Sequence, residues 1–103
     1  MGTYIVEVYK KIAAPLEAVQ ESDFSEHSIG KDILIQAAFK EEIDGHWEAT
    51  AAYYTAVEAD DVDSAQDTAM KSIDFASLDE VINSETVWSA QDGDWTFWEA
   101  TPK

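Results

Sequence analysis

The stretch that decides the fold is residues 33–57, which reads ILIQAAFKEEIDGHWEATAAYYTAV. Every second residue from Ile33 to Phe39 falls on one face of an extended chain, because side chains alternate along a strand. Asp44-Gly45 then separates this run from a second one over 47–57. Asp-Gly is a strong hairpin signal, since both central positions of a type I′ turn need positive φ. The stretch predicts a β-hairpin.

The same stretch leaves a helical alternative open over residues 31–58. Its segment 48–52 is rich in alanine, which propagates helices well. Leu34, Ala37, Ala38 and Glu41 also recur at helical spacing. The sequence does not decide between a hairpin and helices here.

Upstream of the hairpin, residues 3–12 read TYIVEVYKKI and are rich in β-branched and aromatic side chains. Tyr4, Val6, Val8 and Ile12 share one face at a period of two. This pattern predicts a strand with one buried face.

Downstream of the hairpin, the pattern changes to helical spacing. Asp60 or Asp61 is suited to be an N-cap. The apolar positions of the predicted main helix are Val62, Ala65, Ala69 and Ile73. Lys71 near the end of this helix complements its dipole. A capping box, Ser77-Leu78-Asp79-Glu80, predicts a short second helix through Ile82.

A second Asp-Gly pair, Asp92-Gly93, stands between residues 87–90 and 95–98 and predicts a second hairpin. We expect Trp88 and Trp95 in the core, and the position of Trp98 stays open. The predicted fold is α+β: a small single domain, 1–103, with an antiparallel sheet, two Asp-Gly hairpins, one main helix and one short helix.

The composition narrows the function. The 103 residues contain 22 Asp plus Glu against six Lys and no Arg, for a formal net charge of −16. With 46% hydrophobic and 12% aromatic residues, the chain is too apolar for a disordered acidic tail. Without Arg or a basic patch, we expect no direct binding of nucleic acid or of a membrane surface.

Other absences exclude further classes. The chain has no cysteine, which excludes disulfides, zinc ribbons and thiol nucleophiles. No apolar run is long enough to span a membrane, and the N-terminus lacks the pattern of a signal peptide. We expect a soluble protein of the cytoplasm, which would be that of the host cell if the protein is encoded by a phage. The sequence leaves the oligomeric state open.

No recognised catalytic or metal motif is present. His46 beside Glu41, Glu42, Asp44 and Glu48 is the best candidate for a metal ligand, but a solvated hairpin end explains these residues better. Residues 60–67 lack the glycine that a calcium loop needs. No Gly-x-Ser-x-Gly or phosphate-binding fingerprint occurs. We therefore expect a protein that is not an enzyme and that uses no cofactor or metal.

The negative charge is concentrated in the second part of the chain. Residues 41–103 hold sixteen of the 22 acidic residues and only two Lys, for a net of −14. Asp60, Asp63, Asp67 and Asp74 follow spacings of three, four and seven, which predicts one acidic stripe along the main helix. The candidate residues for binding a basic partner are Asp60, Asp61, Asp63, Asp67, Asp74, Glu41, Glu42, Asp44, Glu48 and Trp98.

In size, acidity, lack of Arg and α+β outline, the chain resembles the small acidic inhibitors that bacteriophages and mobile elements direct against CRISPR and restriction systems. The resemblance implies a nucleic-acid mimic that blocks a basic, Lys/Arg-rich protein or nucleoprotein complex. Two alternatives remain. One is a protein-interaction module that uses the C-terminal aromatic hairpin, and the other is an acidic surface selected for solubility at high salt.

Overall fold

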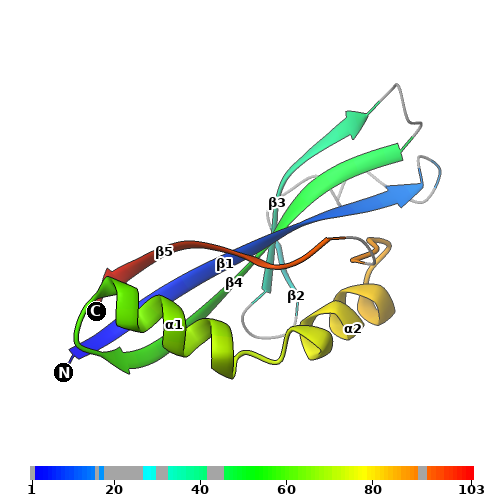
Figure 1. Cartoon of the computed structure of the whole chain (residues 1–103). Helices are drawn as coiled ribbons and strands as arrows, with labels where there is room; N and C mark the ends of the chain where they lie inside the picture. The colour runs from blue at the N-terminus through cyan, green and yellow to red at the C-terminus, as the bar shows by residue number, and fades with distance from the viewer. Residues whose placement is uncertain (1, 16, 18–26, 30–32, 42–45, 91–92) are drawn as a thin grey trace.

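The computed structural model describes residues 2–15, 17, 27–29, 33–41, 46–90 and 93–103, and for 27–29 and 35–41 the backbone alone. The elements along the chain are β1 Gly2–Pro15, β2 His27–Ile29, β3 Ile33–Glu41, β4 His46–Ala59, α1 Val62–Ser72, α2 Phe75–Glu85 and β5 Thr96–Pro102. The strands form one antiparallel sheet in the order β2-β3-β4-β1-β5. Both helices lie on the same side of this sheet (Figure 1). The fold is α+β, as predicted.

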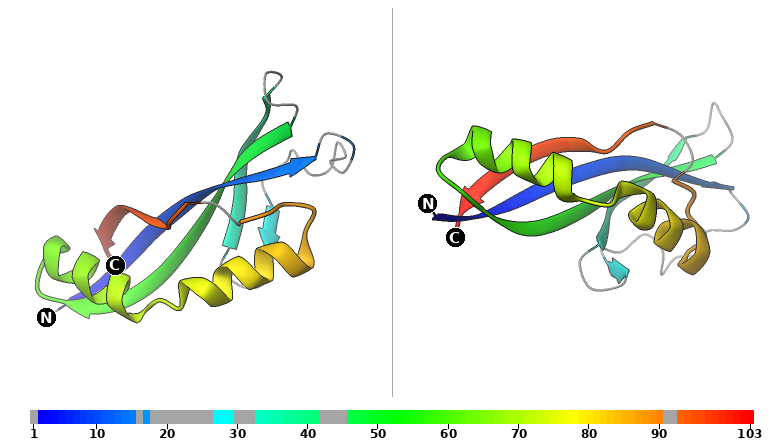
Figure 2. Two further views of the ribbon diagram at one scale, coloured as in Figure 1. Left: turned by 45° about the vertical axis from the view of Figure 1, so that its right-hand side comes forward. Right: turned by 60° about the horizontal axis from the view of Figure 1, so that its bottom comes forward.

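The molecule is elongated, with principal extents of 48 × 24 × 22 Å. Its length follows the two longest strands, β1 and β4, which pair along their whole length from Gly2 opposite Ala59 to Pro15 opposite His46. The two helices follow one another along this axis (Figure 2). Features near Ala59 and features near His46 therefore lie at opposite ends of the molecule.

The first predicted hairpin is confirmed in its strands. β3 and β4 pair from Ile33 opposite Tyr53 to Glu41 opposite His46. Asp44-Gly45 itself lies outside the described residues. The helical alternative for 31–58 is wrong, because β4 is paired on both sides, and two ladders of hydrogen bonds outweigh the helix propensity of its alanines.

The buried face of β1 follows the predicted period of two. Val6, Val8 and Ile12 are buried, and Tyr4 is partly buried against them. The core between this face and the helices also includes Ala49, Ala51, Val57, Ala65, Ala69, Leu78, Ile82, Trp88 and Trp95. Trp88 and Trp95 are thus in the core, as predicted.

The second predicted hairpin is not formed. Ser89 bridges Ala13 of β1 through two backbone hydrogen bonds of 3.1 and 2.7 Å, and β5 pairs with β1 from Tyr9 to Tyr4. Residues 89 and 96–102 thus follow the same edge of β1 in one direction. This edge, on the side away from β4, provides a long row of backbone donors and acceptors. Pairing with it replaces the local hairpin that Asp92-Gly93 predicted.

The helices begin at aspartates. Asp61 caps α1 and accepts a hydrogen bond from the Ser64 amide at 2.7 Å, as one of the two predicted N-caps. Asp74 caps α2 in the same way through the Ser77 amide at 3.2 Å. The prediction of a short helix opening at Ser77 is therefore wrong: α2 has 11 residues, the same as α1.

The earlier start of α2 has a physical reason. Phe75, the first residue of α2, packs against the core and stacks on the buried Trp95, with ring centroids 6.1 Å apart. A start at Ser77 would leave this aromatic contact outside the helix. Burial of Phe75 and the cap at Asp74 together extend α2 toward its N-terminus.

Candidate functional site

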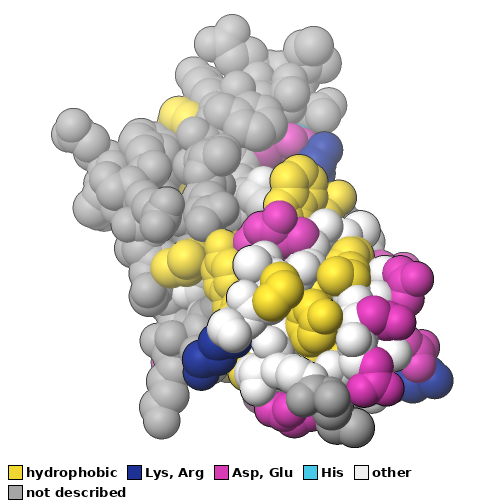
Figure 3. Space-filling model, turned by 90° about the vertical axis from the view of Figure 1, so that its left-hand side faces the viewer, with side chains coloured by type: hydrophobic (Ala, Val, Ile, Leu, Met, Phe, Trp, Pro, Cys, Tyr) yellow, Lys and Arg dark blue, Asp and Glu magenta, His cyan; other side chains and the backbone are white. Residues whose placement is uncertain are grey.

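The predicted aspartates gather at the end of the molecule where β4 turns into α1. Asp60 and Asp61 lie in that turn, Asp63 in the first turn of α1 and Asp67 one turn later, and all four are exposed. Figure 3 shows acidic side chains along one side of this end, beside a group of hydrophobic side chains. Three members of the predicted stripe, Asp60, Asp63 and Asp67, are thus exposed in this part of the molecule.

The predicted stripe along a single helix does not extend to Asp74. α1 ends at Ser72, and its C-cap Ile73 is in an extended conformation. Asp74 therefore belongs to α2 as its N-cap. The spacing of seven residues from Asp67 to Asp74 gives one face only if the helix continues, and here it does not.

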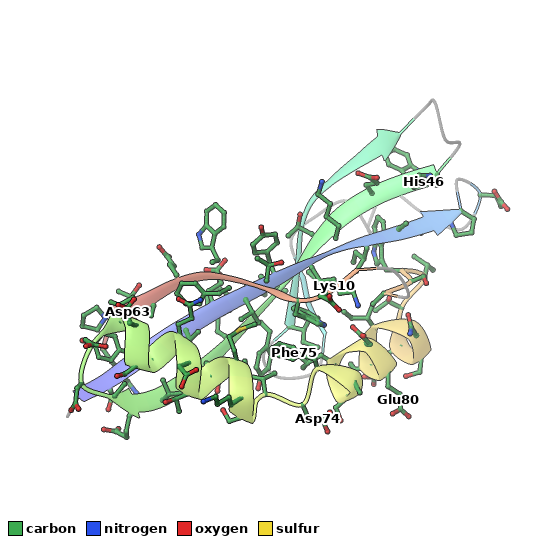
Figure 4. The ribbon with its side chains drawn as sticks, viewed as in Figure 1. Lys10, His46, Asp63, Asp74, Phe75 and Glu80 are labelled. Atoms are coloured by element: carbon green, nitrogen blue, oxygen red, sulfur yellow. The ribbon has the colours of Figure 1, made fainter. Side chains whose placement is uncertain are left out.

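The acidic row instead continues on α2. Glu80 and Glu85 are exposed there, and Figure 4 shows Asp63, Asp74 and Glu80 distributed along the helix pair. These two glutamates are not among the residues predicted to bind a partner. The sequence did contain the relevant pattern, since Glu80 belongs to the capping box that predicted the second helix. That helix was expected to end at Ile82, so Glu85 was not placed on it.

Some of these carboxylates already have partners within the protein. Asp67 forms an ion pair of 3.0 Å with Lys71, in which the side chains are 67% and 76% exposed. Such an exposed pair contributes little to stability, so Asp67 is readily redirected to another cation. Asp61 and Asp74 accept the capping hydrogen bonds. A cap leaves the carboxylate charge exposed to solvent, because both residues are exposed.

A second acidic group was predicted at the β3–β4 hairpin, and the structure describes one of its carboxylates, that of Glu48. His46 is at the end of the molecule opposite Asp63 (Figure 4). Glu48 lies two residues further along β4, and one of its carboxylate oxygens is 3.4 Å from the His46 Nε2. Glu42 and Asp44 lie outside the described residues, as does the side chain of Glu41. The structure thus does not bring Glu48 together with the aspartates of α1.

Trp98 lies on β5 and is 61% exposed. Its ring meets that of Tyr9 edge to face, with centroids 5.6 Å apart and an interplanar angle of 84°. The sequence left the position of Trp98 open. In the structure Trp98 is at the surface, away from the core that holds Trp88 and Trp95.

A buried charge network, which the sequence did not predict, joins β1 to α2. Lys10 is only 4% exposed, and its Nζ lies 3.1 and 3.0 Å from the two carboxylate oxygens of Asp79. The indole Nε1 of Trp95 donates to Asp79 at 2.9 Å. The burial of Lys10 was not predicted, because lysine is almost never fully buried unless it is paired. Its position between Val8 and Ile12, on the apolar face of β1, was the pattern that could have indicated it.

A small pocket of about 280 Å³ adjoins this network where β5 leaves β1. It is lined by Tyr9, Lys10, Lys11, Gly93, Asp94 and Thr96. Because Lys10 is paired with Asp79, and Asp94 and Lys11 both contribute to the lining, positive and negative groups occur here in similar number. The pocket has no marked preference for an ion of either sign.

Among the described residues, no group of three or more His, Cys, Asp or Glu is arranged to hold a metal ion. None of the helices in the described part of the chain is long and apolar enough to cross a membrane. No protein-family model, no curated protein and no solved structure matches this chain.

Proposed function

We propose that this protein is a non-enzymatic acidic binding protein that blocks a nucleic-acid-binding protein or complex by presenting carboxylates in place of phosphates. It would thus be an inhibitor of the anti-CRISPR or anti-restriction type. One observation carries the proposal. Between residues 58 and 85 eight carboxylates are exposed, and Lys71 is the only cation in this segment. The eight are Glu58, Asp60, Asp61, Asp63, Asp67, Asp74, Glu80 and Glu85.

The spacing of these charges supports a comparison with one nucleic-acid strand. Two helices of 11 residues each, at about 1.5 Å per residue, span roughly 33 Å. Six of the carboxylates lie on the helices or their caps. That is about one charge per 6 Å, against one per ~3.4 Å of axis for one strand of duplex DNA. The row is comparable with alternate phosphates of a single strand.

The setting of the carboxylates favours binding over catalysis. The six on the helices and caps are all exposed to solvent. A catalytic carboxylate needs a concave, partly apolar site that alters its protonation, whereas a charge that meets Lys and Arg of a partner needs only access. The partner that fits this surface is a basic, Lys/Arg-rich protein or nucleoprotein complex.

The test is a competition experiment. The heparin-binding proteins of a cell extract are passed over the immobilised protein at 50 mM salt, and the retained proteins are identified and purified. We expect a retained partner that duplex or single-stranded nucleic acid displaces, and whose affinity falls steeply as salt rises toward 200 mM. Retention that neither nucleic acid nor salt affects would contradict the proposal.

Two double variants with equal net charge make the test specific. Asp63→Asn with Glu80→Gln removes two helix-face carboxylates whose side chains make no hydrogen bond or ion pair among the described residues. Glu17→Gln with Asp94→Asn removes two exposed carboxylates elsewhere. We expect the first variant to weaken partner binding at least about tenfold, and the second to leave it within about twofold. Equal losses in the two variants would show that total charge matters and the helix face does not.

A further inference from the structure

The sheet has a second face, which neither α1 nor α2 covers. Val6 and Val8 point into the core with Ala65 and Ala69 of α1. Because side chains alternate along a strand, Glu7 and Tyr9 point to the opposite face of β1. In Figures 1 and 2 both helices lie on the other side of the sheet from this outer face.

A β-bulge in β5 determines which side chains reach this outer face. Glu7 pairs with Glu99 and Val8 pairs with Phe97, so Trp98 is an extra residue in β5. A bulge breaks the alternation of side chains. Phe97 packs against the core, while Trp98 and Glu99 are both exposed. Trp98 and Glu99 therefore stand side by side on the outer face.

The bulge places two aromatic rings and two carboxylates together. Trp98 contacts the ring of Tyr9, and Glu99 is the direct cross-strand neighbour of Glu7. Side chains of directly opposed residues have Cβ atoms about 4.5–5.5 Å apart, so the two carboxylates repel each other. Within the described part of the chain, neither carboxylate has a hydrogen bond or an ion pair. A cation between them would relieve this repulsion.

We propose that this cluster, the bulge site of Glu7, Tyr9, Trp98 and Glu99, binds an arginine or lysine side chain from a segment of a partner protein. An indole face is the best aromatic partner for a cation, and two carboxylates provide the opposite charge. Charge complementarity selects this occupant over the others. Anionic ligands are repelled, and a second copy of the chain would bring another net −16 to the contact.

The position of Lys11 shows where the cation binds. Lys11 lies on the same outer face, one step of about 7 Å beyond Tyr9 and away from Glu7. Its charge repels a cation on that side of the Tyr9 ring. The guanidinium or ammonium group is therefore held on the Glu7 side, between the carboxylates and the exposed Trp98 ring.

The bulge site does not depend on the function proposed for the helix face. It lies on the opposite side of the sheet, and its residues differ from the carboxylates of α1 and α2. One binding surface can fail its test while the other passes, because separate variants neutralise each of them.

The probe is the peptide acetyl-Gly-Arg-Gly-Arg-Gly-amide, titrated at 150 mM salt and followed by the NMR signal of the Trp98 indole N–H. The matched control peptide carries citrulline in place of both arginines, which keeps the shape and removes the charge. We expect saturable shifts of the Trp98 signal with the arginine peptide and at least about fivefold weaker binding of the citrulline peptide. Equal binding of the two peptides would overturn the proposal.

Variants separate the bulge site from general attraction to an acidic protein. Glu7→Gln with Glu99→Gln is expected to raise the Kd for the arginine peptide at least about fivefold. The helix-face variant Asp63→Asn with Glu80→Gln, which has the same net charge, is expected to change it less than twofold. If this double weakens binding as much as the first, the attraction is non-specific and the proposal fails.

The aromatic part of the site is tested with Trp98→Leu and Trp98→Tyr, followed by the backbone signals of Thr96 and Glu99. Both side chains suit an exposed position on a strand. The leucine variant should bind at least about threefold more weakly, and the tyrosine variant should keep most of the affinity because it keeps a ring face. Unchanged binding by the leucine variant would overturn the proposal. A concentration-dependent dimer that Trp98→Leu dissociates, without peptide binding, would assign this face to a second copy instead.

Discussion

The ammonium group of Lys10 lies 3.1 and 3.0 Å from the two carboxylate oxygens of Asp79, and this pair connects the inner strand β1 to the helix α2. Lys10 is almost completely buried, whereas Asp79 is 30% exposed. Asp79 also accepts the indole N–H of Trp95, so one carboxylate holds β1, α2 and the segment before β5 in a fixed relation. The Asp79 carboxylate is the counter-ion of the buried Lys10 ammonium group, which would be costly to leave unpaired in the apolar core.

Removal of Asp79 should therefore be costly. Asp79→Asn leaves the Lys10 charge buried without its counter-ion and weakens the acceptor for Trp95. Loss of one partner of a fully buried pair costs about 3–5 kcal/mol. Because Asp79 is partly exposed, we expect a loss of about 2–4 kcal/mol in the free energy of unfolding, measured by urea denaturation. An unchanged free energy would show that Lys10 is solvated in solution.

The matched control removes both charges. Lys10→Met with Asp79→Asn replaces the buried ammonium by an apolar side chain of similar length. We expect this double variant to be more stable than Asp79→Asn alone, since no unpaired charge remains in the core. A double variant less stable than the single one would mean that the packing of the Lys10 stem, and not its charge, is what matters.

The cap at Asp74 gives a second prediction. Asp74→Ala removes the acceptor for the Ser77 amide and should cost about 1 kcal/mol, while Asp74→Asn should cost little because asparagine caps as well as aspartate. Thermal unfolding followed by circular dichroism distinguishes the two. If both variants lose the same stability, the charge of Asp74 matters and its cap does not.

The packing of α1 gives a third prediction. Ala65 and Ala69 are completely buried between α1 and the sheet, so the helix lies close to it. Ala69→Leu forces extra volume into this contact and should cost about 1–3 kcal/mol. Thr68→Leu makes a similar change at the neighbouring exposed position and should stay within about 0.5 kcal/mol of the parent. Equal effects at the two positions would contradict the close packing.

The net charge gives a fourth prediction. Repulsion among the acidic side chains should lower the melting temperature at 10 mM KCl, and screening should restore it by about 150 mM, where the Debye length is ~8 Å. We expect little further rise above that concentration. A melting temperature that continues to climb into the molar range would instead favour the alternative of an acidic surface selected for high salt.

Local patterns in the sequence were sufficient for much of this fold. The period of two in β1, the alternation around the β3–β4 hairpin and the helical spacing after Asp61 each depend on residues within a few positions of one another. The concentration of acidic residues after residue 40 is also a property of the sequence alone. These features predicted the α+β class, most of the core and the exposed aspartates of α1.

The candidate sites were less predictable, because they depend on which distant segments pair. Asp74 becomes a cap instead of a member of a stripe because packing of Phe75 moves the start of α2, and the row of carboxylates continues on that helix with Glu80 and Glu85. The bulge site exists because β5 pairs with β1 and takes in one extra residue. Nothing in residues 96–102 by themselves indicates that insertion.

The sequence by itself determined the charge, the strand β1 with its buried face and the helical segment after Asp61, since these follow from composition, propensity and periodicity. Only the tertiary structure decided that Lys10 is paired in the core, that Ser89 and residues 96–102 pair with β1 instead of forming a hairpin, and that Trp98 faces solvent. The physical reason is competition: a local turn signal is worth little against a long open strand edge, and that edge comes from residues about 90 positions away in the chain.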